Sequence, residues 1–187
     1  MGMPLSHTEW TVEMLDTLPD DGNRYEVIDG ELYVTPAPSL VHQRASTELF
    51  LLLAPYAKLV GLDPFHAPTA VTFSTQREVQ PDVLVIPRLP NGKHATHFRD
   101  VGRLVLSVEI LSRSTERTDR FVKRPLYQSE RVPEYWIVSL ELRRFERWTP
   151  TALQPELLTS TLSWKPVAAH APLVIDVARY FRSVLDE

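Results

Sequence analysis

The chain has 187 residues, of which 43% are hydrophobic and 24% are charged, and this composition is typical of a folded domain rather than of a disordered or collagen-like chain. It contains no cysteine, which excludes disulfides, thiolate metal sites and cysteine nucleophiles. The net charge of −4 argues against nucleic-acid binding through bulk charge, but it is uneven: residues 1–31 carry eight acids and one base, and the bases are densest at 113–124.

Two elements are predicted in the acidic N-terminal region. A short helix is predicted over residues 8–18, with Thr8 as its N-cap, because apolar residues recur there at four-residue spacing. Residues 24–28 and 31–34 are rich in strand-forming side chains, and Asp29-Gly30 lies between them. Since both turn residues tolerate positive φ, this stretch predicts a tight β-hairpin.

A long helix and two strands are predicted next. Ser39 is a suitable N-cap for a helix that reaches about residue 59 and is closed by Gly61. The face of this helix that is predicted to be buried consists of Ala45, Leu49, Leu52, Leu53 and Tyr56. Strands are then predicted at 71–73 and 79–86, and a polar loop at 87–103.

The second half of the chain begins with its most apolar predicted strand. Residues 104–111 are apolar at nearly every position, which is typical of a central strand covered on both faces. A helix is predicted over 115–129, with a kink or a new first turn at Pro125, because proline lacks an N–H group. Two strands, at 134–140 and 144–149, are predicted to form a hairpin.

The C-terminal part predicts one further helix. Residues 150–172 show no pattern that assigns an element, whereas residues 176–185 form an amphipathic helix with Val177, Tyr180, Phe181 and Val184 on one side. Residues 1–187 are therefore interpreted as a single mixed α/β domain, with a central mixed β-sheet flanked by helices and preceded by an N-terminal helix and a β-hairpin.

Two acids stand within apolar predicted strands. Asp82 shares a strand face with Gln80, and Glu109 shares one with Ser107, so neighbouring strands would form a polar island in an apolar sheet. A buried carboxylate is costly unless it is paired or bound to a cation, and oxygen ligands suit Mg²⁺. The periodicity leaves open the alternative that each acid lies at a strand end in water or pairs with an arginine.

The helix predicted at 115–129 brings basic groups close behind the Glu109 strand. Its bases are Arg117, Arg120, Lys123 and Arg124. A lysine there can reach back to the carboxylates, where it would orient or deprotonate a metal-bound water, or stabilise charge on a phosphate oxygen.

An ordered series of motifs between about residues 25 and 148 resembles the Uma-type putative restriction endonucleases, which belong to the PD-(D/E)xK nuclease superfamily. The motifs are Tyr25-Glu26-Val27-Ile28-Asp29-Gly30-Glu31, His42, Gln80-Pro81-Asp82, Val108-Glu109-Ile110-Leu111-Ser112, Ser114-Thr115, Asp119, Lys123-Arg124-Pro125-Leu126-Tyr127 and Val132-Pro133-Glu134-Tyr135-Trp136-Ile137-Val138. The resemblance implies a restriction-endonuclease-like core, a magnesium-dependent phosphodiesterase centre and, commonly, a homodimer.

The resemblance also implies roles for single residues. Asp82 matches the aspartate of the family motif and Glu109 its acidic partner, and both would hold the metal together with the carbonyl of Ile110. The usual lysine two places after the acid is Leu111 here, so the ordinary E-x-K pattern is absent. Lys123 on the following helix matches the position to which this family has moved the lysine.

Accessory residues are expected around this centre. Glu31 and His42 are each interpreted as an additional ligand or a water-orienting group, or else as a solvated strand residue and a hydrogen-bonded helix residue. Gln80 is expected beside Asp82, and Glu26 is interpreted as structural.

The sequence thus predicts an endonuclease that hydrolyses DNA with Mg²⁺, for which Mn²⁺ can substitute, and with Asp82, Glu109 and Lys123 as catalytic residues. The DNA backbone would be contacted by Arg117, Arg120 and Arg124. The alternative is a nuclease-like module that binds nucleic acid or a protein partner without cutting, and a lysine that points away from the two acids would favour it. RNA or branched or damaged DNA is a third possibility. A cytoplasmic homodimer without membrane segments is expected.

Overall fold

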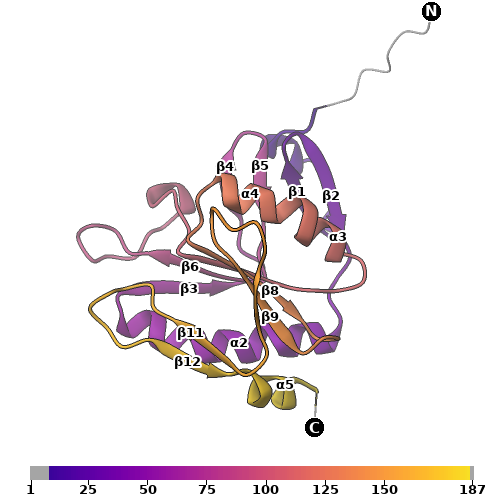
Figure 1. The fold of residues 1–187 in the computed structure, drawn as a ribbon. Coiled ribbons are helices and arrows are strands. Elements are labelled where there is room, and N and C mark those ends of the chain that lie inside the picture. The colour runs from indigo at the N-terminus through magenta and orange to yellow at the C-terminus, as the bar shows by residue number, and fades with distance from the viewer. Residues whose placement is uncertain (1–8, 186–187) are drawn as a thin grey trace, which may run out of the picture.

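The computed structural model describes residues 9–185, whose strands form three sheets (Figure 1). The six-stranded sheet contains, in spatial order, β10 (Glu156–Leu158), β9 (Arg144–Trp148), β8 (Glu134–Ser139), β7 (Leu106–Ile110), β6 (Val83–Pro87) and β3 (Leu62–His66). The four-stranded sheet contains β2 (Glu31–Thr35), β1 (Arg24–Ile28), β5 (Arg77–Val79) and β4 (Val71–Ser74). A two-stranded sheet contains β11 (Thr161–Trp164) and β12 (Leu173–Asp176).

The N-terminal helix α1 (Val12–Leu15) is shorter than the sequence predicts. The predicted cap, Thr8, lies outside the described residues. The N–H of Trp10 donates to the carbonyl of Gly30, and that of Val12 to the carbonyl of Thr75, each at 2.8 Å. These tertiary hydrogen bonds hold residues 10–12 against the four-stranded sheet, so the helix begins only at Val12.

The hairpin and the long helix agree with the sequence. Asp29 and Gly30 have φ of 53° and 81°, as the turn between β1 and β2 requires. Helix α2 (Leu40–Leu59) is capped by Ser39, whose hydroxyl accepts the N–H of His42. Leu52, predicted to be buried, is 41% exposed, because the buried face of α2 is centred on the line of small and apolar residues that includes Ala45, Leu49, Leu53 and Ala57.

The prediction of one continuous strand at 79–86 is wrong, and the difference shapes the site. It divides into β5 and β6, which belong to different sheets. The break falls at Gln80-Pro81-Asp82, where Pro81 has no N–H to give a ladder and the N–H of Gln80 donates to the Glu26 side chain. The short segment therefore carries the chain from one sheet to the other. The strand β3, after Gly61, was not predicted.

The central strand β7 is buried at all five positions, as predicted. It is antiparallel to β6 and parallel to β8, and the crossover between β7 and β8 runs over three short helical segments. These are α3 (Glu116–Thr118), the π-helical η2 (Asp119–Lys123) and α4 (Arg124–Ser129). Pro125 lies in the first turn of α4, which is one of the two positions that the sequence allows.

The C-terminal half contains elements that the sequence did not assign. The β8–β9 hairpin is confirmed. The stretch 150–172 holds β10 and β11, and the polar loop after β6 holds a single 3₁₀ turn, η1 (Phe98–Asp100). Helix α5 (Val177–Leu185) buries the four apolar residues that its periodicity predicts. No helix among residues 9–185 is long and apolar enough to cross a membrane.

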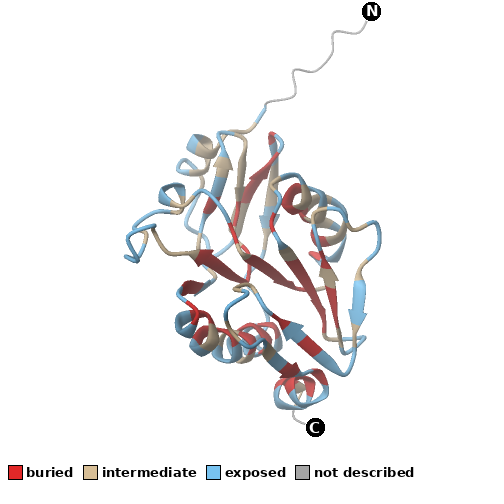
Figure 2. Ribbon diagram, turned by 60° about the vertical axis from the view of Figure 1, so that its left-hand side comes forward, coloured by how far each residue is buried: buried red, intermediate tan, exposed pale blue. Residues whose placement is uncertain are grey.

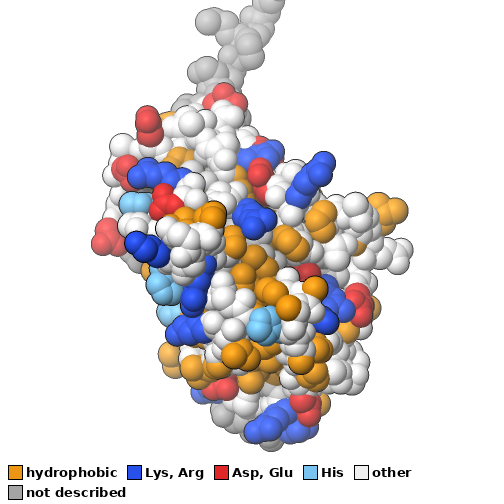
Figure 3. Space-filling model, turned by 90° about the vertical axis from the view of Figure 1, so that its left-hand side faces the viewer, with side chains coloured by type: hydrophobic (Ala, Val, Ile, Leu, Met, Phe, Trp, Pro, Cys, Tyr) orange, Lys and Arg blue, Asp and Glu red, His pale blue; other side chains and the backbone are white. Residues whose placement is uncertain are grey.

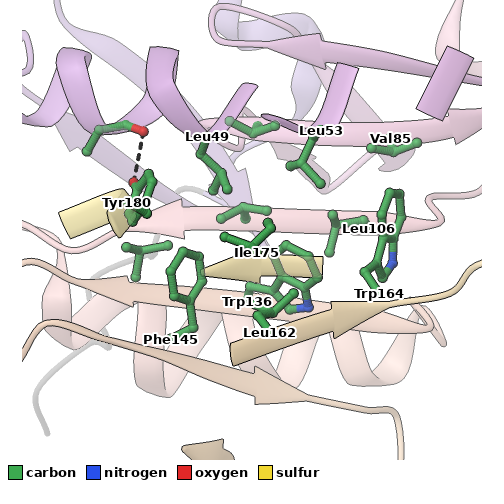
Figure 4. Packing of buried hydrophobic residues seen from close by; sticks show 14 of the residues in the cluster. Leu49, Leu53, Val85, Leu106, Trp136, Phe145, Leu162, Trp164, Ile175 and Tyr180 are labelled. Carbon is green, nitrogen blue, oxygen red and sulfur yellow. Dashed lines mark hydrogen bonds between the residues drawn. The ribbon is translucent and has the colours of Figure 1, made fainter. Parts of the chain in front are cut away.

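Two hydrophobic clusters cover the two faces of the large sheet, and Figure 2 shows that its central strands are buried. On one face α2, α5 and β11–β12 pack over the sheet, with Leu49, Leu106 and Trp136 among the side chains that meet there (Figure 4). On the other face Leu84 and Tyr135 pack with residues of the four-stranded sheet and α4. Asp82 lies between β5 and β6, where the chain passes from one sheet to the other, and Glu109 lies on the central strand β7.

Candidate active site

Asp82 is fixed at the junction between the sheets by contacts to both of its carboxylate oxygens. Its Oδ2 accepts the N–H of Ile110 at 2.8 Å, and its Oδ1 accepts Nη1 of Arg24 at 3.1 Å. Its main-chain carbonyl accepts the N–H of Ala67 at 3.0 Å. The side chain is only 5% exposed, so Asp82 is not a solvated strand-end acid, but the other alternative from the sequence, pairing with an arginine, does hold for Asp82 through Arg24.

His42, in the first turn of α2, meets Asp82 and the end of β7. Its Nε2 lies 3.1 Å from Oδ2 of Asp82 and 2.9 Å from the carbonyl oxygen of Ile110. The structure therefore brings together His42 and two of the three groups that the sequence names as metal ligands.

Lys123 points back to the central strand. Its Nζ lies 3.0 Å from Oε1 of Glu109, 2.8 Å from Oε1 of Glu26 and 3.8 Å from Oδ1 of Asp119. The hydroxyl of Tyr127 donates to the same Glu109 oxygen at 3.3 Å. Lys123 is 1% exposed and faces Glu109, which is the orientation that the displaced-lysine interpretation needs.

Strand β1 supplies two charged residues that the sequence reasoning did not assign to the site. Arg24 and Glu26 lie on one face of the strand, two residues apart; the first contacts Asp82 and the second contacts Lys123. Glu26 Oε1 also accepts the N–H of Gln80 at 2.7 Å. Asp119 was likewise missed as a site residue. For Arg24 and Glu26 the sequence did contain a signal, because both are charged residues on the same face of a predicted strand.

The site holds more buried carboxyl groups than permanent cations. Four carboxylates, on Glu26, Asp82, Glu109 and Asp119, face two permanent cations, on Arg24 and Lys123. That excess is the condition under which a bound cation stabilises a buried cluster.

The carboxyl groups respond differently to this environment. Burial raises the pKa of Glu109 well above its usual value, although Lys123 opposes the change. Burial also raises the pKa of Asp119 to about 6, and neither oxygen of this carboxyl group has a hydrogen-bond partner in the described part of the chain. For Asp82 burial acts upward, but His42 and Arg24 outweigh it and the pKa is lowered.

The donor set around Asp82 fits a divalent cation in its chemistry. Among residues 9–185 no three His, Asp or Glu side chains form a metal-binding group, so a main-chain oxygen would have to contribute. Asp82 Oδ2, the Ile110 carbonyl and His42 Nε2 offer two oxygens and one imidazole nitrogen. His42 Nε2 lies 2.9 Å from the Ile110 carbonyl oxygen and 3.1 Å from Asp82 Oδ2, so the three atoms are close enough to one another to hold the same cation.

A pocket of about 420 Å³ opens beside Asp82. Arg24, His42, Gln80 and Asp82 line it, together with residues 35–39 and the start of the segment after β7. Glu109 and Lys123 do not line it and are buried behind Asp82. The structure does not bring Glu31 to this centre, because its register partner is Ile28, at the end of β1 away from Arg24.

The three arginines predicted to contact DNA have different surroundings. Arg120 pairs with the buried Glu146, and Arg124 lies over the ring of Trp148 at 4.7 Å. Arg117 is exposed and makes no hydrogen bond or ion pair with the described residues. Only Arg117 therefore has its guanidinium group directed to solvent without a protein partner.

Exposed bases also gather away from the pocket. The loop after β6 carries Lys93, Arg99 and Arg103, all exposed, and Figure 3 shows Lys, Arg and His side chains around an apolar surface on this side of the molecule. The loop lines a hollow of about 760 Å³ with Phe65 and Phe73. None of these residues lines the pocket beside Asp82.

Comparisons with known proteins identify the family and the fold of this chain. The model of the Uma2 family, described as putative restriction endonuclease, matches residues 12–177. A crystal structure of a putative nuclease belonging to DUF820, from Anabaena variabilis ATCC 29413, superposes with a TM-score of 0.72 at 20% sequence identity, covering 94% of this chain and 99% of that one. That likeness shows a shared fold. A comparison with curated proteins finds no match.

Proposed function

The chain belongs to the Uma2 family of putative restriction endonucleases, and we propose on this basis that it is a divalent-metal-dependent endonuclease that hydrolyses phosphodiester bonds in DNA. One observation carries the proposal: an excess of buried carboxylates stands behind a pocket whose wall is formed by Asp82, His42 and Arg24. An isolated structural ion pair would not need four acids around two cations.

The residues have distinct roles in the proposed reaction. Asp82, the Ile110 carbonyl and His42 would hold Mg²⁺, or Mn²⁺ in its place, with Glu109 held by Lys123 behind them, and the ion would supply positive charge against the phosphate oxygens. The N–H of Ile110 fixes the direction of the Asp82 carboxylate. Lys123 holds Glu109 in place and keeps an ammonium group beside the site, where it supports positioning of the attacking water.

One observation favours the second candidate, a nuclease-like module that binds nucleic acid without cutting. Glu109 and Lys123 lie behind the pocket wall rather than on it, so contact with substrate requires the wall to move. The two candidates differ in whether magnesium-dependent strand breaks appear.

The test is plasmid nicking with Mg²⁺ by the wild-type protein and by Asp82→Asn. Asp63→Asn is the matched control, because Asp63 is also a buried aspartate held by an arginine and a histidine, Arg88 and His94, but lines no part of the pocket. We expect nicking by the wild type and by Asp63→Asn and a loss of at least 100-fold in Asp82→Asn. Activity that survives in Asp82→Asn would refute the assignment, and an inactive wild type would favour the binding module.

A further inference from the structure

Arg24 is the basic side chain placed to meet a substrate at the pocket. Among the described residues that line the pocket, Arg24 is the permanent cation, and the only other basic group is the imidazole of His42. The Arg24 side chain is 18% exposed and reaches the pocket from the first residue of β1. Arg120 and Arg124, by contrast, have their guanidinium groups engaged within the protein.

Part of the Arg24 guanidinium remains open for a ligand. Both hydrogens of Nη1 are used, one toward the carbonyl of Gln80 at 2.8 Å and one toward Oδ1 of Asp82 at 3.1 Å. The other donors, on Nε and Nη2, make no hydrogen bond within residues 9–185, yet they are not among the buried unpartnered atoms. They are therefore not sealed in the core, and Arg24 is one of the residues that line the pocket.

The charge of Arg24 and its position suit an anion that approaches Asp82. Burial acts to lower the pKa of Arg24, but Glu109, Glu26 and Asp82 more than offset this, so the guanidinium stays charged. It contacts Oδ1 of Asp82, whereas His42 and Ile110 contact Oδ2. Arg24 therefore contacts one carboxylate oxygen of Asp82, and the groups that would hold a cation lie at the other oxygen.

We infer that Arg24 binds a phosphate oxygen of the nucleic-acid strand that enters the pocket, through the N–H groups that Asp82 and Gln80 leave free. A phosphodiester carries one negative charge and offers two unesterified oxygens, and arginine donors form short charge-assisted hydrogen bonds to such oxygens. The inference rests on the proposed function for the identity of the anion. It makes Arg24 a substrate-binding residue rather than only the partner of Asp82.

The experiment measures DNA binding without metal, so that cleavage plays no part in it. Fluorescence anisotropy of a labelled 20-base-pair duplex is recorded in EDTA over a series of salt concentrations. Loss of one phosphate contact reduces the slope of log K against log salt by about 0.9 for a duplex. We expect this reduction in Arg24→Gln, and we expect Arg24→Lys to keep most of the wild-type slope because it keeps the charge.

The control is Arg144→Gln. Arg144 also pairs with a buried carboxylate, that of Glu146 at 2.9 Å, but it lies on β9 and lines no part of the pocket. We expect its slope to equal that of the wild type. If Arg24→Gln folds poorly, the double variant Arg24→Gln with Asp82→Asn removes the unpaired carboxylate, and its slope is compared with that of Asp82→Asn alone.

The outcomes separate this inference from the proposed function. An unchanged slope in the Arg24 variants, or a wild type that shows no salt-dependent binding, would overturn the inference even if plasmid nicking succeeds. A reduced slope with a wild type that does not cut DNA would support the role of Arg24 and refute the proposed hydrolysis.

Discussion

Asp119→Asn is expected to stabilise the protein at neutral pH. The Asp119 carboxyl group is 1% exposed, has no hydrogen-bond partner in the described part of the chain, and lies 3.8 Å from its closest cation, Nζ of Lys123. Glu26 and Asp82 add repulsion, and the ionised form of Asp119 is therefore disfavoured in the folded protein. Asparagine has nearly the same shape and carries no charge.

The magnitude follows from the pKa. Asp119 has a folded-state pKa of about 6 against an ordinary value of 3.8, so the folded protein holds this proton more tightly than the unfolded chain. Stability from this group is then highest below pH 3.8 and is lost as the pH rises to about 6. A tenfold change in proton affinity is worth about 1.4 kcal/mol, so ionised Asp119 costs about 3 kcal/mol at pH 7.5. Asp119→Asn should recover most of this, which is roughly 5–10 °C in Tm for a chain of this size.

Thermal unfolding followed by circular dichroism, in EDTA at pH 7.5 and at pH 4, measures the effect. The difference between Asp119→Asn and wild type should be large at pH 7.5 and small at pH 4, where both side chains are neutral in the folded state. Asp63→Asn should have the opposite sign at pH 7.5, because it leaves Arg88 and His94 without their carboxylate. A lower Tm for Asp119→Asn at pH 7.5 would mean that attraction to Lys123 outweighs burial, and would refute the reasoning.

Three further changes test other parts of the structure. Mg²⁺ at about tenfold its dissociation constant should stabilise the wild type by about 1.4 kcal/mol, and Asp82→Asn should lose this rise in Tm; equal shifts in both proteins would place the ion elsewhere. Lys123→Met leaves three buried carboxylates without their ammonium partner. It should lower the free energy of unfolding in denaturant by roughly 3–5 kcal/mol at pH 7.5, and by less at pH 5. A decrease below about 1 kcal/mol at pH 7.5 would contradict the buried cluster. Gly30→Ala should cost about 1 kcal/mol by the same measurement, since its φ is 81° and a Cβ there would lie 2.8 Å from Cγ of Glu9; no loss would show that the turn relaxes.

Local patterns predicted the elements whose signals lie within a few residues. The Asp29-Gly30 turn, the Ser39 cap and the apolar run of β7 each have a local physical cause, and all three are confirmed. The break at Pro81 had a local signal, the missing N–H of the proline, but the hydrogen bond that turns the chain there, from the Gln80 N–H to Glu26, spans 54 residues and leaves no local pattern. The irregular stretch 150–172 was unreadable for the same reason, since β10 depends on pairing with β9.

The candidate site was predictable only in part. Asp82 and Glu109 stood out as acids in apolar predicted strands, and Lys123 as one of several bases on the following helix. The resemblance to the nuclease family then indicated that the three belong to one site. The positions of Arg24 and Glu26 depend on how the hairpin docks against the crossover helices, which no spacing in the sequence encodes. Glu31 was expected at the site, but strand alternation alone does not say which end of the hairpin faces it. The homodimer, the cytoplasmic location and the single-domain extent stay predictions.

The crossing segment Gln80-Pro81-Asp82 joins the two sheets through charged groups rather than through a continuous ladder. Arg24 and Glu26 come from the four-stranded sheet; Arg24 contacts Asp82 in the crossing segment, and Glu26 contacts Lys123 in the crossover between β7 and β8. The four-stranded sheet and the site should therefore open together as one cooperative unit, while the side of the core that is covered by α2 and α5 stays closed. Hydrogen exchange of β1 amides would then report occupancy of the site, because a bound ligand stabilises the contacts of Arg24 and Glu26 that must break in this opening.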